Sequence, residues 1–338
     1  MKNLPDVTLE KGKAEDVLRQ IARTFGKELA KNCRKHELSL PMINPNGKMI
    51  SYGDLSGMDV LILDIPGKVD WRIRFTGEFS EPIMFISMCA GTLDVASPSE
   101  NFDLATLQSS IYCGADGEDQ TLHFKGDEGV AAMIIYVHKT SFFKEMECEN
   151  LELPSDLMKV IEGFSDDFLF EDIFHLPIID AVSDVIDQHE SGLLNSSFAA
   201  SRVHEVLYLM LNEYKTYGEK KHRKVIRRES QVQLIRDAKT ILNGRLRNPP
   251  TIPELAHMVG LNQQTLKQGF RQLLGKTINQ QLNDKRLEQA GILLRAGELS
   301  VGEVAAEVGY NNPGYFSRRF REKYGVTPSY FNRVCEED

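Results

Sequence analysis

Glutamine, lysine and arginine side chains recur at helical spacing in two similar segments near the C-terminus, residues 251–271 and 300–321. Their outward-facing positions are Gln264, Lys267, Gln268 and Arg271 in the first segment and Gly314, Arg318 and Arg321 in the second. Glutamine and arginine carry paired hydrogen-bonding groups that match the edges of adenine and guanine in the major groove. These residue types therefore indicate recognition of duplex DNA rather than catalysis.

The two segments share a framework that predicts two helices joined by a tight turn. Ala256 and Ala305 are small residues that suit the point where the two helices cross closely, and Gly260 and Gly309 suit a turn with positive φ. The second helix is then expected to be capped by an asparagine and to point aromatic and leucine side chains inward. The residues in these roles are Asn262, Leu266 and Phe270 in one copy and Asn312, Phe316 and Phe320 in the other.

A single helix is predicted between the two copies, over residues 277–295. Its apolar positions, which could pack against both copies, are Ile278, Leu282, Leu287, Ala290 and Leu294. A helix of about 20 residues is about 30 Å long, close to one turn of a DNA duplex. Two DNA-reading helices could therefore enter consecutive major-groove segments on one side of the duplex.

Charge divides the 338-residue chain into an acidic and a basic part. The formal net charge of -9 by itself argues against a nucleic-acid binder. Residues 220–338, however, hold 21 Lys and Arg against 12 Asp and Glu, while residues 1–219 hold 19 against 37. This asymmetry indicates two bodies with different partners, of which the basic one suits a polyanion.

Short apolar or alternating runs predict a β-rich domain ahead of the basic part. After a helix predicted over Ala14–Ala30, the expected strands are Val60–Ile65, Trp71–Phe79, Ile83–Cys89, Thr106–Tyr112, Gln120–Phe124 and Val130–His138. Six or seven such strands suggest a sandwich or barrel. The fold class is thus α+β: a β-rich sandwich or barrel with following helices, then an all-α domain with two helix-turn-helix motifs.

Helical periodicity returns after Leu153 and is strongest over Ser196–Tyr217. There an apolar stripe repeats through Val203, Val206, Leu207, Met210, Leu211 and Tyr214. Two interpretations stay open: the stripe packs on its own domain, or it pairs with a second copy to make a dimer. The basic segment Gly218–Arg228 is interpreted as an exposed hinge.

Several functional classes are disfavoured by what the sequence lacks. Five scattered cysteines, odd in number and without a C-x-x-C pair, fit neither a disulfide framework nor a zinc ribbon, and they favour a reducing cytosol. We see no export signal and no apolar run long enough to span a membrane. An alkyl-transfer repair enzyme would need a Pro-Cys-His context, and a hydrolase a G-x-S-x-G elbow, and neither is present. We expect no enzyme: no catalytic residue, metal site or cofactor is predicted.

Residues 251–333 resemble the DNA-binding domain of the AraC/XylS transcriptional regulators. The positions that carry the resemblance are Leu255, Ala256, Gly260, Phe270, Gly275, Arg286, Leu287, Ala290, Leu293, Leu294, Val304, Ala305, Val308, Gly309, Tyr310, Tyr315, Phe316, Ser317, Phe320, Gly325, Val326, Thr327, Pro328 and Tyr330. Departures from the pattern are Gln281 in place of an aromatic residue and the helix-interior glycines Gly269, Gly291 and Gly302, and Gly314 lacks a side chain at a usual contact position.

The resemblance implies a set of DNA-binding residues. Base-facing positions are Gln263, Gln264, Lys267 and Gln268 in the first copy and Pro313, Gly314 and Arg318 in the second, while Arg271, Ser317 and Arg321 suit phosphate contacts. Asn312 is also included in the DNA-binding set. The resemblance also implies promoter DNA and RNA polymerase as partners, in the cytoplasm.

The layout of the front part is similar to the pyochelin-regulator branch of that family, with a cupin-like arabinose-sensing barrel as a neighbouring alternative. The expected division is an effector-sensing and dimerisation domain over 1–217, a linker over 218–230 and the DNA-binding domain over 231–338. Candidate effector-binding residues at a barrel mouth are Trp71, Arg72, Arg74, Phe85, Tyr112, Tyr136 and His138. The alternative is a ligand-independent regulator whose front domain only dimerises or binds a protein partner.

Overall fold

The computed structural model describes residues 6–32, 34–41, 44–53, 55, 57–77, 82–139, 155–162, 167–190, 196–219 and 229–336. The chain forms two compact units, Met1–Arg223 (the first unit) and Lys224–Asp338 (the second unit). Most of the hinge expected over residues 218–230 lies outside the described residues.

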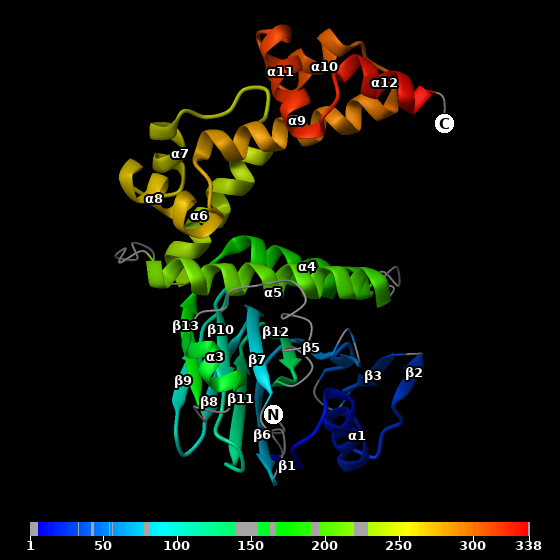
Figure 1. Cartoon of the computed structure of the whole chain (residues 1–338), viewed down its shortest axis with the longest axis vertical. Helices are drawn as coiled ribbons and strands as arrows, with labels where there is room; N and C mark the ends of the chain where they lie inside the picture. Colours follow the sequence, from blue (N-terminus) through cyan, green and yellow to red (C-terminus); the bar gives the residue numbers. More distant parts are fainter. Residues whose placement is uncertain are drawn as a thin grey trace. The chain divides into compact units, whose positions relative to one another are not determined.

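The first unit contains two sheets, which agrees with the predicted β-rich sandwich (Figure 1). The five-stranded sheet has the order β1 (Val7–Glu10), β6 (Val69–Thr76), β11 (Gln120–Gly126), β8 (Thr92–Ala96) and β9 (Asn101–Leu104). The eight-stranded sheet has the order β13 (Phe168–Ile173), β10 (Ser109–Cys113), β7 (Ile83–Ala90), β12 (Gly129–Val137), β5 (Met58–Pro66), β4 (Lys48–Tyr52), β3 (Lys35–Ser39) and β2 (Ala30–Asn32). Neighbouring strands are antiparallel, except that β1 pairs in parallel with β6.

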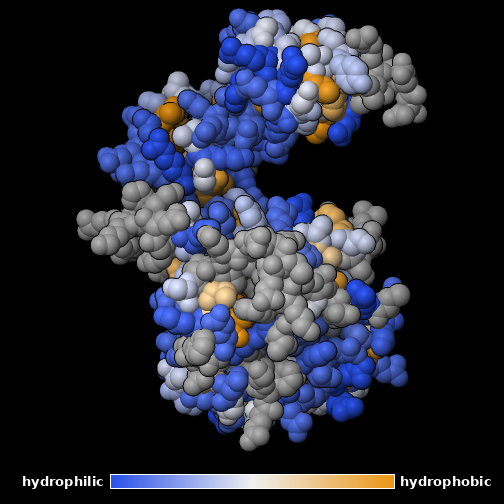
Figure 2. Space-filling model, in the orientation of Figure 1, coloured by the Kyte–Doolittle hydropathy of each residue, from blue (hydrophilic) through white to orange (hydrophobic). Residues whose placement is uncertain are grey.

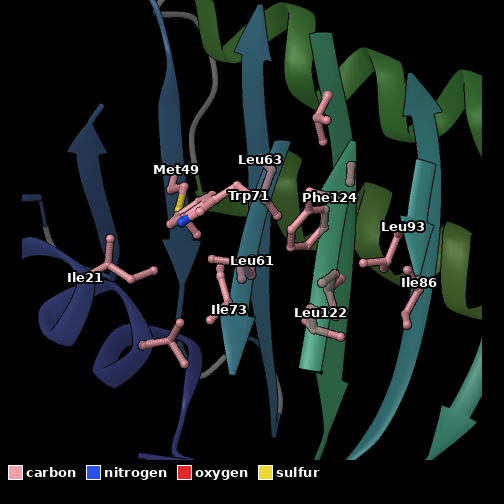
Figure 3. Packing of buried hydrophobic residues seen from close by; sticks show 14 of the residues in the cluster. Ile21, Met49, Leu61, Leu63, Trp71, Ile73, Ile86, Leu93, Leu122 and Phe124 are labelled. Carbon is pink, nitrogen blue, oxygen red and sulfur yellow. The ribbon is translucent and has the colours of Figure 1, made fainter. Parts of the chain in front are cut away.

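The core between the two sheets follows from the alternation seen in the sequence. In β6, Trp71, Ile73 and Phe75 are buried while Arg72 and Arg74 are exposed, so this strand has one buried and one solvent-exposed face. Trp71 lies among Met49, Leu63 and other apolar side chains of this core (Figure 3). The first-unit helix α1 (Ala14–Thr24) contributes one face to the same cluster.

The predicted first helix is six residues too long. It ends at Thr24 because Gly26 adopts φ +61°, a conformation that turns the chain away from the helix, and Ala30 already begins β2. Phe25 and Leu29 nevertheless pack, half-buried, against the core that α1 covers. The apolar spacing beyond Thr24 therefore reflected burial of a loop and not a longer helix.

The outer face of the eight-stranded sheet is covered by helices α3 (Ser155–Ile161), α4 (Leu176–Glu190) and α5 (Ser196–Glu219). Strands β5, β7 and β12 are consequently buried on both faces, which explains their nearly continuous apolar sequences. Residues 168–173, expected to be part of a helical stretch, form the edge strand β13 paired with β10. Strands β1 to β4, β8 and β9 were likewise not predicted.

The stripe on α5 packs on its own unit. Val203, Val206 and Met210 are fully or almost fully buried against the eight-stranded sheet and α4, and the Tyr214 ring contacts Phe168 and Phe170 of β13 at centroid distances of 5.3 and 4.8 Å. The first of the two sequence interpretations is the one that the structure favours, since this face is already occupied. No helix within the described part of the chain is long and apolar enough to cross a membrane.

The second unit consists of helices α6 (Glu229–Asn243), α7 (Ile252–Met258), α8 (Gln263–Leu274), α9 (Ile278–Ala296), α10 (Val301–Glu307), α11 (Pro313–Tyr324) and α12 (Pro328–Glu336). Helix α9 matches the single helix predicted between the two copies. It runs from the α7–α8 pair, which we call the first motif, to the α10–α11 pair, the second motif (Figure 1). Helix α6 packs on α7 and α8, and it therefore lies against the first motif.

The burial of the α5 stripe can be tested with two neighbouring positions. Met210→Ala should lower the free energy of unfolding of the first unit by about 2–5 kcal/mol, because it leaves a cavity in a packed core. Tyr208→Ala, at a side chain that is 63% exposed, should change it by less than about 0.5 kcal/mol. The fluorescence of Trp71, the single tryptophan, follows the first unit during urea denaturation. Equal effects of the two variants would contradict the packing described here.

Candidate nucleic-acid interface

Each motif begins with the same reciprocal hydrogen bonds at a helix start. The Thr251 backbone N–H donates to Glu254 Oε2 (2.8 Å), and the Glu254 N–H donates to Thr251 Oγ1 (3.4 Å). Ser300 and Glu303 repeat the arrangement at 2.9 and 3.4 Å. These capping boxes satisfy backbone donors that a helix leaves open, and they explain why a glutamate recurs at this place in both copies.

The turn in each motif depends on a glycine followed by an asparagine. Gly260 and Gly309 adopt φ +70° and +91°, as the sequence predicted. The side chain of Asn262 then accepts a hydrogen bond from the Thr265 N–H (2.8 Å), and that of Asn312 accepts one from the Tyr315 N–H (3.0 Å). These caps fix where α8 and α11 start, and hence which of their residues point outward.

The inner faces of α8 and α11 are fully buried. Leu266 and Phe270 have no exposed surface in the first motif, and Phe316 and Phe320 have none in the second. The rings of Phe316 and Phe320 lie 5.7 Å apart, in a cluster with Leu287, Ala290 and Leu294 of α9. Helix α9 thus supplies part of the core of the second motif.

The outer faces carry the predicted DNA-binding residues. Ten of the eleven are exposed, and Ser317 is half-buried: Gln263, Gln264, Lys267, Gln268, Arg271, Asn312, Pro313, Gly314, Ser317, Arg318 and Arg321. Figure 2 shows hydrophilic surface over both α8 and α11. The structure therefore places the predicted set on the side of each helix that lies opposite the buried one. The Asn312 side chain is already engaged as a cap.

The cations of the second unit differ in whether an acidic side chain pairs with them. Among the described residues, the side chains of Lys267, Arg271 and Arg321 have no hydrogen-bond or ion-pair partner. Five other cations of the unit are paired with acids: Lys276 with Asp284, Lys285 and Lys323 with Glu288, Arg319 with Glu322, and Arg247 with Glu307. Within the described part of the chain, Arg236, Arg245 and Arg295 also have no acidic partner, so the uncompensated charges of the unit include those on the two outer faces but are not confined to them.

Tyr315, one of the positions that carry the family resemblance, lies on the surface of the second motif. Its side chain is 41% exposed, and the Arg318 guanidinium lies over its ring, 5.3 Å from the centroid. A guanidinium stacked on an aromatic ring is held in a narrower range of orientations than a free one. The spacing of three residues between Tyr315 and Arg318 on a helix was the signal for this contact.

Two departures from the family pattern are accommodated inside the unit. Gln281 on α9 is buried, and its Nε2 donates to Asn243 Oδ1 of α6 (3.4 Å), so a polar contact stands where an aromatic residue is usual. At Gly291 an added Cβ would lie 3.2 Å from the Tyr324 hydroxyl oxygen, so α9 and the end of α11 approach closely there. At Gly302 an added Cβ would meet nothing within 4 Å.

The candidate effector-binding residues do not converge on one site. Trp71, Tyr112 and Tyr136 are buried between the sheets, whereas Phe85 belongs to the core on the helix side of the eight-stranded sheet. Arg72 and Arg74 are exposed on the outer face of β6, where Arg72 Nε donates to His123 Nδ1 (3.3 Å). His138 Nε2 lies 3.2 Å from Asp59 Oδ2.

A hollow in the first unit brings together a different set of residues. It is lined by Lys11, Gly12, Val17, Phe75, Pro82, Met84, Gln120 and Tyr136, and its empty volume is about 340 Å³, open solvent included. Gln120 is 7% exposed, and its Nε2 has no hydrogen-bond partner among the described residues. Of the predicted effector residues, Tyr136 lines this hollow. Lys11 and Gln120 were not predicted, because neither stands out by spacing or by neighbours in the sequence.

Comparisons with known proteins concern mainly the second unit. Residues 255–333 match the family model of a helix-turn-helix domain. The HTH-type transcriptional activator RhaR of Escherichia coli K12 is 32% identical over 95 residues, which cover 28% of this chain and 34% of RhaR. The chain thus spans about a third of the length of the curated relatives it matches.

Two solved structures are among those similar to this chain. An AraC-type transcriptional regulator from Chromobacterium violaceum is 21% identical and covers 30% of this chain and 92% of its own, with a TM-score of 0.30. ToxT of Vibrio cholerae is 13% identical and covers 82% of this chain and 98% of its own, with a TM-score of 0.28. For residues 255–333, the family model and the curated relatives confirm the predicted AraC-type helix-turn-helix domain.

The capping boxes generate a stability prediction. Ser300→Ala and Thr251→Ala should each destabilise the second unit by about 1 kcal/mol, because a backbone donor loses its partner. Far-UV circular dichroism should show the loss, while Trp71 fluorescence stays unchanged because it reports the first unit.

The same boxes respond to pH. The hydrogen bonds from Ser300 lower the pKa of Glu303 below its ordinary value of 4.5, and those from Thr251 lower that of Glu254. Their stabilising contribution is therefore complete above the ordinary pKa and is lost as the pH falls through the lowered one. Glu303→Gln should flatten this acid dependence; an unchanged acid profile would count against the box.

Proposed function

We propose that this chain, whose C-terminal unit is an AraC-type helix-turn-helix domain, is a transcriptional regulator that binds duplex DNA sequence-specifically. Helices α8 and α11 each read one of two consecutive major-groove segments. In this proposal the glutamines and Arg318 contact bases, while Arg271, Ser317 and Arg321 contact phosphates. RhaR is a transcriptional activator, and the same role here is part of the proposal.

The observation that carries the proposal is the unpaired charge on the two outer faces. Lys267, Arg271 and Arg321 are exposed without an acidic partner among the described residues, in a unit whose other cations are frequently paired. Unpaired cations on a rigid helix face repel one another, and this repulsion is relieved when phosphates replace their counterions. Glutamine side chains interleaved with them supply base-reading groups.

A response to a small molecule is the finer part of the proposal, and the hollow of the first unit supports it. The buried Gln120 Nε2 donor has no partner among the described residues, and an unsatisfied buried donor costs free energy that an oxygen acceptor would recover. Lys11, whose ammonium donates a hydrogen bond to the Glu118 carbonyl oxygen, is a cation among the residues that line the same hollow. The ligand class that this chemistry fits is a small carboxylate or carbonyl compound. Self-association through the first unit and contact with RNA polymerase are included because the family resemblance implies them.

Substitutions on the outer faces should separate base reading from phosphate binding. Arg318→Ala should reduce the difference in binding free energy between the preferred and the other bases at one position by about 1–3 kcal/mol. Arg271→Ala should weaken binding to all sequences alike, and it should reduce by about 1 the slope of log affinity against log salt concentration. Duplexes selected by the full chain from a random pool provide the test sequences, and fluorescence anisotropy at several salt concentrations provides the affinities.

Glu298→Gln is the matched control on the same unit, since Glu298 is exposed outside the two outer faces. It should leave both the base preference and the salt slope near those of the unaltered chain. If selection enriched no duplex over single strands, the DNA-binding proposal would fail.

Ligand responsiveness can be tested by thermal stability of the full chain against a panel of small carboxylic acids. A true ligand at about 100 times its Kd should stabilise the first unit by about 2.7 kcal/mol. Gln120→Leu should abolish that gain, and Arg74→Ala, at an exposed residue away from the hollow, should keep it. A panel without any stabilising member would favour the ligand-independent regulator, whose first unit dimerises or binds a protein.

A further inference from the structure

A contact between the two motifs lies at the middle of α9. Arg286 projects from this helix, and its guanidinium donates two hydrogen bonds to one acceptor, the backbone carbonyl of Leu246, from Nε (3.0 Å) and Nη2 (2.8 Å). Leu246 lies in the loop that joins α6 to α7, on the side of the first motif. A charged, two-point donor on one carbonyl is a strong and directional connection.

The same guanidinium also contacts the second motif. Its carbon atom Cζ lies 5.5 Å from the centroid of the Tyr310 ring, directly after the turn between α10 and α11. Arg286 is half-buried, and burial lowers its pKa from the ordinary value, yet an arginine stays charged at neutral pH. One side chain therefore joins the first motif's loop, the helix α9 and the second motif's turn.

Gly309 shows how closely the two motifs approach. A Cβ at this position would lie 2.6 Å from Arg286 Nη2, 2.6 Å from the Leu246 carbonyl oxygen and 3.0 Å from the Arg247 Cα. Gly260, the equivalent residue of the first motif, has the same left-handed backbone but would place a Cβ within 4 Å of nothing. A glycine is thus required at the first turn for its backbone angle, and at the second turn for space as well.

A second link joins the same loop to the second motif. Arg247 Nη1 lies 3.2 Å from Glu307 Oε2 at the end of α10. Because both side chains are exposed, this ion pair contributes little to stability, but it restrains the same movement. A single helix between two bodies leaves them free to bend about it, whereas a helix with cross-links beside it does not.

We propose that Arg286 and Gly309 set the distance and rotation between α8 and α11, so that the protein tolerates one spacing between its two DNA segments. This inference rests on the proposed DNA-binding function for its consequence, although the restraint itself is independent of DNA. Arg286 is a positioning residue in this account. Adding one base pair between the segments rotates the second by about 36° and moves it by about 3.4 Å, which two rigidly linked helices cannot follow.

The restraint can be measured on the full chain without DNA. Spin labels on keto amino acids introduced at Gln268 of α8 and Arg321 of α11 leave the five cysteines unmodified. The distribution of distances between the two spin labels should be narrow in the unaltered protein and broad in Arg286→Met and Gly309→Ala. Gly260→Ala also strains its backbone but does not touch the loop, so the distribution of label-to-label distances should stay narrow in this variant. It should also stay narrow when the same two labels are placed in Glu288→Gln. Equal distributions in the unaltered protein and in Arg286→Met would overturn the proposal.

The consequence for DNA is measured with the two selected segments placed at the selected spacing and at one or two base pairs more or less. The unaltered protein should lose at least about tenfold in affinity at each changed spacing, and Arg286→Met less than about threefold. Arg286→Lys, which keeps the charge but not the two-point donor, should behave like Arg286→Met. If Arg286→Met weakened every spacing alike, Arg286 would be a general structural or phosphate-binding residue, which contradicts the proposal.

The two arms distinguish the failure of this inference from that of the proposed function. If the protein selects no duplex, but the distribution of distances between the labels on α8 and α11 broadens in Arg286→Met, the proposed function fails and the restraint is supported. A protein that binds a two-segment duplex at several spacings equally well keeps the function and lacks the restraint.

Discussion

Burial of one face of α8 and of α11 is the constraint on which the rest of the second unit depends. Phe270 and Phe320 have no exposed surface, and each motif around them has a capped helix start and a glycine turn, while α9 forms one wall of the core around Phe320. Because the buried apolar face fixes the rotation of each helix about its axis, it also fixes which residues lie on the opposite, exposed face. Among the described residues, the cations Lys267, Arg271 and Arg321 on that face have no acidic partner, which makes it suited to an anionic partner.

Helix α9 is both a spacer and a structural wall. Its nineteen residues correspond to about 28 Å, so the two motifs are separated by nearly one duplex turn. Leu287, Ala290 and Leu294 bury it in the second motif, and Gln281 ties it to α6 by a hydrogen bond. Arg286 adds a direct bond to the loop before α7. A substitution in this helix is therefore expected to affect where both motifs lie.

The second unit could be predicted well because its signals are local. Gly260, Gly309, Asn262 and Asn312 determine the turns within a few residues of sequence, and the structure gives each of them the predicted role. The bond from Arg286 to Leu246 joins residues 40 positions apart, and no periodicity indicates it. Tyr315 was named only as a position that carries the family resemblance, and the resemblance by itself did not indicate that its ring is exposed.

The first unit was predicted more coarsely because its strands are defined by partners far along the chain. Strand β13 exists since β10 offers it an edge, and its own six residues carry little alternation. The segment from Trp71 was predicted as a strand, and the structure shows a strand with one buried and one solvent-exposed face. Sequence spacing could not predict that Lys11, Gln120 and Tyr136 line one hollow, because they come from three separate parts of the fold.

Hydroxyl-radical footprinting of the full chain on a selected duplex tests the central claim, that one protomer presents two DNA-reading helices to one side of the double helix. The account predicts two protected patches on the same face, with centres about 10 base pairs apart. A single patch, or two patches on opposite faces of the duplex, would contradict it.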